Sequence, residues 1–499
     1  MLNIEQSRLV RRLSNPIFLF SFFIFLVQKT LNHLKIKNLP PVYFYPPVIR
    51  EKYDALNRRI QNLDEIHEYE FFKKRIRLAT CYLNVTSEKV WYQEFKDDED
   101  AASLHRWNWL VYAASEETYR KNNTSNEWGW AYIRSWISEI GLGNAWIHLE
   151  PYTISERIVN ACIFLHITSK NMSLPKDIAI AIELMAYQLA DTLEYKDSMS
   201  TGNHVFNNAR GLYFAGITLG NQSLVDLALV IFKDRIDSLV SPDGFFSEGS
   251  SHYHLLFTRW IFEIVWLANK AKHKDVELLL QPYLTYLLDR SKFFMVYNEK
   301  NEVKIPLIGD ISPDFPPEWL FSVAHVQLNK GQVSCLTSKK SLPNYSWHNL
   351  FCSSFLESHS FHKDNSNLKY KIQSFPKSFW HRFDWQKWTL FLHAVPGNQK
   401  NQSGHFHEDL TSFVLFYDGN EIFIDSGRRS YEHNDEIANF QKSSLGHNSI
   451  LINGLGPGLM PNQKRYPSFY KSSSVTTVSY THLRAHETVL DLVCRLLLE

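Results

Sequence analysis

Apolar residues recur at every third or fourth position through much of the first two thirds of the chain. This spacing places apolar side chains along one face of a helix, so it predicts a persistently helical region from about residue 66 to residue 330. Helices are expected at residues 107–114, 128–140, 154–167, 177–194, 207–219, 224–240, 252–270 and 276–296. Successive helices without intervening strands are typical of a helical toroid or solenoid.

One of these helices carries a local start signal. Thr153 and Glu156 have the spacing of a capping box, in which two side chains satisfy free backbone donors at a helix N-terminus. The sequence therefore predicts that the helix over 154–167 begins beside Thr153.

The pattern changes after the prolines of residues 313–317. Short runs of β-forming residues then dominate, at 388–394, 410–417, 421–425 and 449–452. Asp418-Gly419-Asn420 separates the second run from the third and is a strong hairpin signal. We expect an antiparallel β-sandwich to follow the helices, which makes the fold α+β and multidomain.

The length and these changes of pattern divide the chain into four segments. At 499 residues it is too long for one ordinary core. We expect an N-terminal apolar segment and linker at 1–65, a helical domain at 66–330, a sheet domain at 345–477 and a tail at 478–499. The tail does not continue the pattern of the strands, and it resembles the translation of an adaptor or vector sequence. We therefore expect a non-native tail and a sandwich that lacks its last strands.

The N-terminus combines basic and apolar residues. Arg8, Arg11 and Arg12 precede a mostly apolar run at 17–27, which is short for a membrane-spanning helix. The run fits the core of a signal peptide, although no small-residue cleavage site follows it. An uncleaved anchor and a helix lying against the membrane or the protein remain open.

The composition narrows the class of protein. Hydrophobic residues make up 44% and charged residues 21% of the chain, which indicates a globular protein. The net charge is +1 and no basic block stands out, so we expect no nucleic-acid partner. Aromatic residues make up 14%, and exposed Trp and Tyr suit stacking on sugar rings. The five cysteines are scattered without a CxxC pair, which favours unpaired thiols.

A candidate metal site lies within residues 401–454. His405 and His407 are one residue apart, so their side chains share a side only if the backbone is extended through both. The predicted hairpin carries Asp425 back towards His407, and His447 stands before the run at 449–452. His407, Asp425 and His447 can therefore converge, and zinc takes such N and O ligands. On spacing alone, three surface or capping residues remain the alternative.

Two polar stretches interrupt the helical region. Residues 201–211 gather hydrogen-bonding groups at a helix start, and residues 241–254 form a polar loop at the mouth of another helix. The candidate residues are Asn203, His204, Asn207, Asn208 and Arg210 in the first stretch and Glu248, His252, Tyr253 and His254 in the second. Taken singly, each stretch can also be read as a capping segment or an ordinary loop.

Together these stretches resemble a known family. GNHVFNNARGLYFAG, DGFFSEGSSHYH and SGHFHEDLTSF…IDSG…HNS resemble, in order and approximate separation, the heparinase II/III family of polysaccharide lyases and the related alginate lyases. YTISERIVN, at 152–160, also looks like a run found in relatives linked to envelope polysaccharides. The resemblance covers about residues 107–454. It implies an (α/α) toroid followed by a β-sandwich, with the cleft between them.

The resemblance also implies a reaction and its residues. The reaction is β-elimination on a uronic-acid-containing polysaccharide, with Asn203 and His405 neutralising the substrate carboxylate. Tyr253 matches the catalytic tyrosine and His204 a histidine that serves as base in some relatives. If the C5 proton and O4 are syn, Tyr253 can act as both base and acid. If they are anti, His204 as base and Tyr253 as acid is the more natural arrangement. Arg210, Glu248 and His254 are expected to contact substrate.

The family resemblance bears on the metal as well. Relatives carry a structural zinc in the sandwich, at positions that match His407, Asp425 and His447. Asn207 stands where many relatives have Glu, so a supporting contact is expected to differ. We expect an acidic polysaccharide partner and a bacterial cell-envelope location, periplasmic or secreted, with a cytoplasmic one open.

Two other functions remain as alternatives. A glycoside hydrolase would use Glu248 with Asp243 or Asp310 as its carboxylate pair. A non-catalytic glycan-binding or assembly protein of an envelope-polysaccharide pathway would keep the zinc and the aromatic cleft but would not need Tyr253. The sequence predicts neither the sugar nor the oligomeric state.

Overall fold

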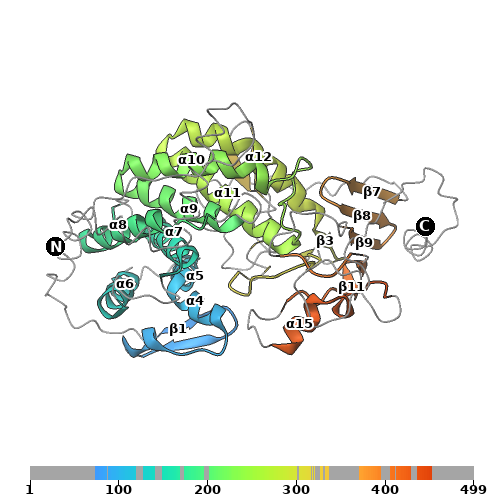
Figure 1. Cartoon of the computed structure of the whole chain (residues 1–499), viewed down its shortest axis with the longest axis horizontal. Helices are drawn as coiled ribbons and strands as arrows, with labels where there is room; N and C mark the ends of the chain where they lie inside the picture. Colours follow the sequence, from blue (N-terminus) through green and yellow to red (C-terminus); the bar gives the residue numbers. More distant parts are fainter. Residues whose placement is uncertain are drawn as a thin grey trace, which may run out of the picture.

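The computed structural model has its helices at one end and its sheet at the other (Figure 1). It describes residues 74–86, 88–119, 127–140, 149–168, 173–195, 202–299, 303–315, 317, 320, 326–329, 332–335, 370–394, 405–410, 412–428 and 435–451. The N-terminal apolar run and the predicted tail lie outside these residues. Within them, no helix is both long enough and apolar enough to span a bilayer.

The helical part contains every helix that the apolar spacing predicts. Its helices are α4 (Asp98–Arg106), α5 (Asn108–Tyr119), α6 (Glu127–Ile140), α7 (Pro151–Thr168), α8 (Lys176–Asp191), α9 (Asn203–Leu219), α10 (Gln222–Leu239), α11 (Ser251–Ala271) and α12 (Lys274–Phe293). Helices that follow one another in the chain pack side by side, as α9 does with α8 and α10, and α11 with α12. Helix α4 was not predicted.

The first described segment is a hairpin, so the prediction of helix from residue 66 is wrong there. β1 (Lys74–Arg77) pairs antiparallel with β2 (Tyr82–Val85). Ile76 lies between two arginines and is 2% exposed, so apolar and polar residues alternate at this point. Alternation with a period of two favours a strand over a helix.

The predicted capping box is also wrong. Helix α7 begins at Pro151, a residue type suited to the first helical position because it has no N–H to satisfy. Thr153 Oγ1 donates instead to Glu150 Oε2 at 2.9 Å. Glu156 points into the protein core, where its Oε1 lies 2.8 Å from Arg210 Nη1.

The centre of the helical part holds a buried cluster of four charges, two positive and two negative. Arg210 Nη2 lies 2.6 Å from Glu263 Oε2, and Arg259 Nε lies 2.9 Å from Glu263 Oε1. Glu156 completes the cluster through Arg210, and none of the four side chains is more than 1% exposed. Each buried charge faces an opposite charge, which offsets the free-energy cost of removing it from water. Because its members come from α7, α9 and α11, the cluster joins these three helices.

The sheet has the order β11-β10-β9-β8-β7, and every neighbouring pair is antiparallel. Its strands are β7 (Tyr370–Phe375), β8 (Trp380–Trp385), β9 (Trp388–His393), β10 (Phe413–Tyr417) and β11 (Asn420–Phe423). Asp418 and Gly419 both have positive φ, at 51° and 75°, as the predicted hairpin turn requires. β7 and β8 were not predicted, and the other sheets among the described residues have two strands each.

The predicted strand at 449–452 is absent from its described part, residues 449–451. The side chain of Asn448 contacts the sheet region there. Its Nδ2 donates to the carbonyl oxygens of Phe413 at 2.9 Å and Ile424 at 2.8 Å. The amide thus links the start of β10 to the residue after β11.

The sheet packs on the end of α12 and shares its core. Trp380 and Phe391 belong to the same apolar cluster as Phe293. Arg382 Nη1 donates to the carbonyl oxygens of Phe293 at 2.7 Å and Met295 at 2.8 Å. These contacts hold the sheet against the helices at the place where the polar stretches of both parts meet.

The described residues also form two short strand pairs. They are β3 (Val296–Tyr297) with β4 (Val303–Lys304), and β5 (Val326–Asn329) with β6 (Gln332–Cys335).

Candidate active site

The candidate site lies where the helical part and the sheet part share a junction segment, residues 303–310. On one side, Ser251 N donates to Ile308 O at 3.1 Å, and on the other, Asp310 N donates to His405 O at 3.0 Å. Gly309 has φ +78°, and a Cβ there would lie 2.8 Å from Gly249 O and 2.9 Å from His405 O. Only glycine permits this approach, so the junction segment brings α11 and the HxH run together.

Tyr253 and His405 stack directly on each other. Their ring centroids are 3.6 Å apart at an interplanar angle of 20°. Ser250 fixes Tyr253 by capping α11, because its Oγ accepts from Tyr253 N at 3.0 Å. Ser250 Oγ also donates to Asp310 O at 2.7 Å, which ties the cap to the junction segment.

Asn203 connects the start of α9 to the same histidine. Its Nδ2 lies 3.2 Å from His405 Nε2 and donates to Glu248 Oε2 at 2.9 Å. The backbone N–H of Asn203 donates to Glu248 Oε1 at 2.9 Å, so Glu248 holds the first residue of α9 in place. Burial raises the pKa of Glu248, although His405, His204 and Asn203 counteract it.

Asp310 is the central anion of the site. Its carboxylate lies 3.3 Å from His405 Nδ1, 2.9 Å from His407 Nε2, 3.2 Å from Arg428 Nη1 and 3.8 Å from Lys442 Nζ. Burial raises its pKa, but the hydrogen bonds from His405 and His407, with the charges of His407 and Lys442, hold the pKa well below its usual value. Asp310 therefore contacts both histidines of the HxH run, whose side chains reach the same carboxylate.

His204 stands at the second position of α9, with a side chain that is 48% exposed. Its ring packs against Tyr152 at a centroid distance of 4.9 Å, and its Nδ1 lies 2.9 Å from Glu194 Oε1. Desolvation lowers the pKa of His204, but Glu194, Glu150 and Glu248 outweigh it and raise the pKa above its usual value.

Two predicted substrate contacts lie elsewhere. Arg210 is fully buried in the four-charge cluster, with both of its terminal nitrogens against carboxylates. His254 is 1% exposed, its Nε2 lies 3.1 Å from Leu287 O, and burial lowers its pKa to about 3. Both residues therefore support the helical part from inside, whereas Glu248 lies in the site.

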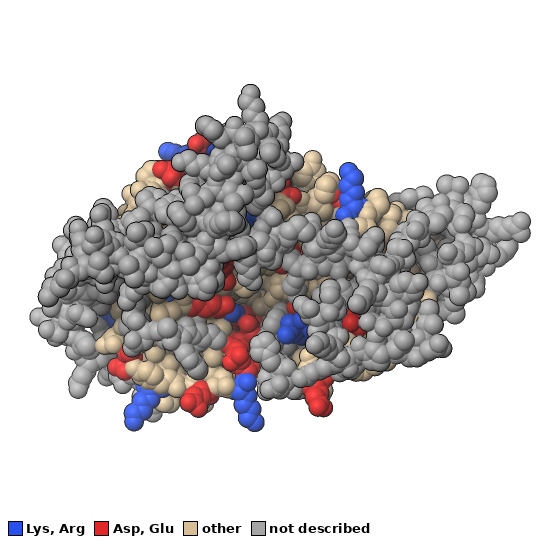
Figure 2. Space-filling model, viewed as in Figure 1, with Lys and Arg blue, Asp and Glu red and all other residues tan. Residues whose placement is uncertain are grey.

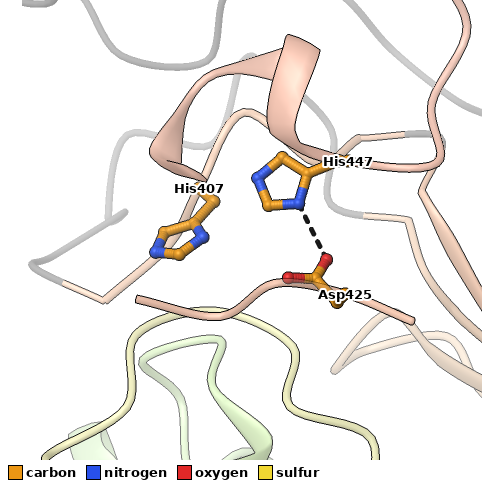
Figure 3. Close-up of side chains that lie close together, drawn as sticks. All are labelled: His407, Asp425 and His447. Atoms are coloured by element: carbon orange, nitrogen blue, oxygen red, sulfur yellow. Dashed lines mark hydrogen bonds and ion pairs between the residues drawn. The ribbon is translucent and has the colours of Figure 1, made fainter. Parts of the chain in front are cut away.

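The predicted metal residues do converge. His407, Asp425 and His447 offer ligand atoms that all lie within 4.8 Å of one another. Figure 3 shows the three side chains close together, with His447 Nδ1 at 2.7 Å from Asp425 Oδ2. The residues come from the HxH run, the segment after β11 and the segment after helix α15 (Glu436–Lys442).

The chemistry of this cluster fits a cation. His407 Nδ1 and His447 Nε2 are buried and have no hydrogen-bond partner among the described residues. Burial lowers the pKa of His407, which favours the neutral ring that a metal requires. Asp310 holds the other nitrogen of His407, an arrangement common for metal-ligating histidines. The group can therefore hold a metal ion.

Comparison with known proteins decides the family. The model of the heparinase II/III N-terminus matches residues 47–315, and the model of the heparinase II/III-like C-terminal domain matches residues 368–488. The chain belongs to the heparinase II/III family. Membership makes it a polysaccharide lyase, as its motifs predict. No curated protein matches it.

A solved structure agrees with this heparinase II/III family fold. A heparinase III crystal structure is 16% identical, with a TM-score of 0.51, over 87% of this chain and 69% of that one. The heparan sulfate lyase HepC from Pedobacter heparinus is 18% identical over 80% of this chain and 59% of its own, with a TM-score of 0.40. The heparinase III match confirms the predicted order of a helical region followed by an antiparallel sheet.

Sequence reasoning missed the supporting residues of this lyase. Asp310 was considered only as a hydrolase carboxylate, and Glu194 and Arg428 were not considered. Asp310 lies 95 residues before His405, and Arg428 reaches the site through Asp310 rather than through a motif residue. Glu194 is only ten residues from His204, but no motif includes it. The glycine before Asp310 was the one available sign that the backbone makes a close approach there.

Proposed function

We propose that this lyase cleaves a uronic-acid-containing polysaccharide by β-elimination at the junction of its two parts. The observation that carries the proposal is the meeting of Asn203, Tyr253 and His405. These residues come from the start of α9, the start of α11 and the HxH run, and they lie in mutual contact through His405. A donor amide, a phenol and an imidazole at one place suit proton transfer beside a carboxylate.

The reaction needs its charge stabilised before a proton leaves. Asn203 Nδ2 would donate to the uronate carboxylate, and Asn203 and the ring of His405 together would neutralise it, so that negative charge can build on its oxygens as the C5–H bond breaks. The electron pair of that bond forms the C4–C5 double bond while the C4–O4 bond breaks. Tyr253 would protonate O4 and, in a syn substrate, would first accept the C5 proton.

One face of the molecule shows how charges are distributed around the described residues (Figure 2). On the face drawn in Figure 2, acidic and basic side chains of the described residues are mixed, and acidic ones gather near the centre. No broad basic area on the described part of that face would hold an acidic polymer by charge alone. The names of the solved relatives, a heparinase and a heparan sulfate lyase, support glycosaminoglycan uronates as the first substrates to test.

The test is the ultraviolet absorbance of the unsaturated uronate that elimination leaves behind. The protein would be incubated with heparan sulfate, hyaluronan, alginate and bacterial uronate polysaccharides. We expect absorbance to rise on at least one of them, in step with the appearance of reducing ends. Reducing ends without absorbance would indicate hydrolysis. The absence of both signals from folded, metal-loaded protein would favour the hypothesis of a non-catalytic glycan-binding protein.

The hydrolase alternative has little support from the carboxylates it needs. Asp310 is held in ion pairs with His407 and Arg428, and Glu248 is bound to Asn203. Asp243 Oδ2 accepts from the backbone N–H groups of residues 377 and 378, at 2.7 and 3.0 Å. None of the three is presented as an acid beside a second free carboxylate.

We propose zinc as the ion at His407, Asp425 and His447, because two imidazoles and a carboxylate suit its tetrahedral coordination. Its part would be structural, fixing the segment that carries His405. His407→Ala is expected to weaken metal binding by at least about 100-fold and to lower Tm, because it removes a ligand and a partner of Asp310. Metal analysis and thermal melts would measure both effects.

The matched control is His273→Ala, whose ring stacks on Tyr213 in the helical part. That variant should keep its full metal content. A His407→Ala protein with unchanged zinc content would contradict the assignment of the ligands.

A further inference from the structure

A buried amide holds one acidic side chain against His204. Asn208 lies one helical turn after His204 on α9, so the two side chains share a face. Asn208 Oδ1 accepts from the backbone N–H of Glu194 at 3.0 Å, and Asn208 Nδ2 donates to Glu194 Oε2 at 3.0 Å. These two bonds fix the backbone and the carboxylate of Glu194 together.

The second oxygen of this carboxylate is directed at the histidine. Glu194 Oε1 lies 2.9 Å from His204 Nδ1, and the Glu194 side chain is 19% exposed while Asn208 is fully buried. A carboxylate at Nδ1 favours the tautomer that carries its proton there. Nε2, on the opposite side of the ring, then keeps its lone pair.

We propose that Glu194, held by Asn208, is a positioning residue that prepares His204 to accept the C5 proton through Nε2. The inference rests on the proposed elimination and adds to it a second base besides Tyr253. Such a base is needed where the C5 proton and O4 lie on opposite faces of the sugar. His204 is half exposed, as a group that must reach a polymer has to be.

Several groups besides Glu194 act on this imidazole. Glu150, which precedes α7, and Glu248, in the loop before α11, both raise the pKa of His204, and Tyr152 of α7 packs on its ring. Glu194 is the one that also bonds to a ring nitrogen. Removing its charge should therefore lower the pKa of His204 and free the ring to adopt either tautomer.

The experiment compares Glu194→Gln with wild type by two measurements. The first is the rate at which diethyl pyrocarbonate, which attacks the neutral ring, modifies His204 at different pH values, read by mass spectrometry of its peptide. The second is the pH profile of kcat/KM on whichever polymer yields the unsaturated product. In Glu194→Gln we expect both midpoints to move to lower pH, because a weaker base loses its proton at lower pH.

The same variant should lower kcat on its pH plateau by about 10- to 100-fold, less than the loss of the base itself. Glu150→Gln is the matched control, since it removes a nearby charge but no bond to the ring. Its midpoints should move less, and its kcat should fall less than that of Glu194→Gln. Tm should change little in either variant, which separates positioning from folding.

The outcomes distinguish the two proposals. Product from wild type, with modification midpoints and plateau kcat in Glu194→Gln equal to those of Glu150→Gln, would overturn the positioning role and leave the elimination standing. Absence of product from wild type would overturn the elimination and the base role together. Protection of His204 from modification by added Zn²⁺ or Ca²⁺ would overturn the inference in favour of a cation site.

Discussion

Tyr253→Phe is expected to reduce kcat by about 10²–10⁴-fold, with KM and Tm nearly unchanged. Phenylalanine keeps the ring that stacks on His405 at 3.6 Å, so the shape of the site should persist. The lost hydroxyl is the group that would protonate O4 and, in a syn substrate, remove the C5 proton. Initial rates of unsaturated product, with a binding isotherm for the intact polymer, would measure the two effects separately.

The matched control is Tyr286→Phe, which removes a hydroxyl from a side chain that is 57% exposed and outside the site. It should retain wild-type kcat. Full activity in Tyr253→Phe would show that the phenol is not the acid, and the proton for O4 would then have to come from another group.

Asp310→Asn is expected to lose both activity and stability. The amide has nearly the shape of the carboxylate but no charge, so Arg428, Lys442 and the two histidines would lose their shared anion. Breaking a buried charge pair costs about 3–5 kcal/mol, because the remaining charge stays buried without a partner. We expect kcat to fall as well, since His405 would lose the group that holds its Nδ1.

Unfolding in denaturant and kcat measured well below Tm would report these two losses. Asp289→Asn, at a side chain that is 61% exposed, is the control and should change neither quantity appreciably. If Asp310→Asn unfolded at the wild-type midpoint, the anion would not be holding the junction together. A normal kcat in that variant would show that Asp310 is not needed to orient His405.

The elements that the sequence predicted are those whose own residues determine them. The helices show apolar spacing over many turns, and the turn at Asp418 and Gly419 requires the positive φ that these residue types tolerate. One error was local, because α7 starts at Pro151 rather than beside Thr153. Another depended on distant groups, because Asn448, beside the strand expected at 449–452, donates to two backbone carbonyls of the sheet region.

Some residues of the site could be predicted from the sequence and others could not. His407 and Asp425 could be grouped because a hairpin relates them by short-range geometry. His447 was grouped with them from the strand expected at 449–452, which is absent from its described part, residues 449–451. Asp310 could not be predicted, since it meets His405 across 95 residues of chain, and Glu194 could not because it stands outside every motif. Arg210 and His254 looked like substrate contacts beside the right motifs, yet their side chains point into the core. Proximity along a helix therefore identified the region but not the direction of each side chain.

The close approach of Gly249 to the HxH run has a consequence for how such a site can diversify. A Cβ at Gly249 would lie 2.0 Å from Cε1 of Phe406, the residue between the two histidines. A larger residue at 249 would need a smaller one at 406, and it would still be strained because Gly249 has φ +69°. New substrate preferences are easier to reach through outward-facing residues, while this inner contact remains closed to single substitutions.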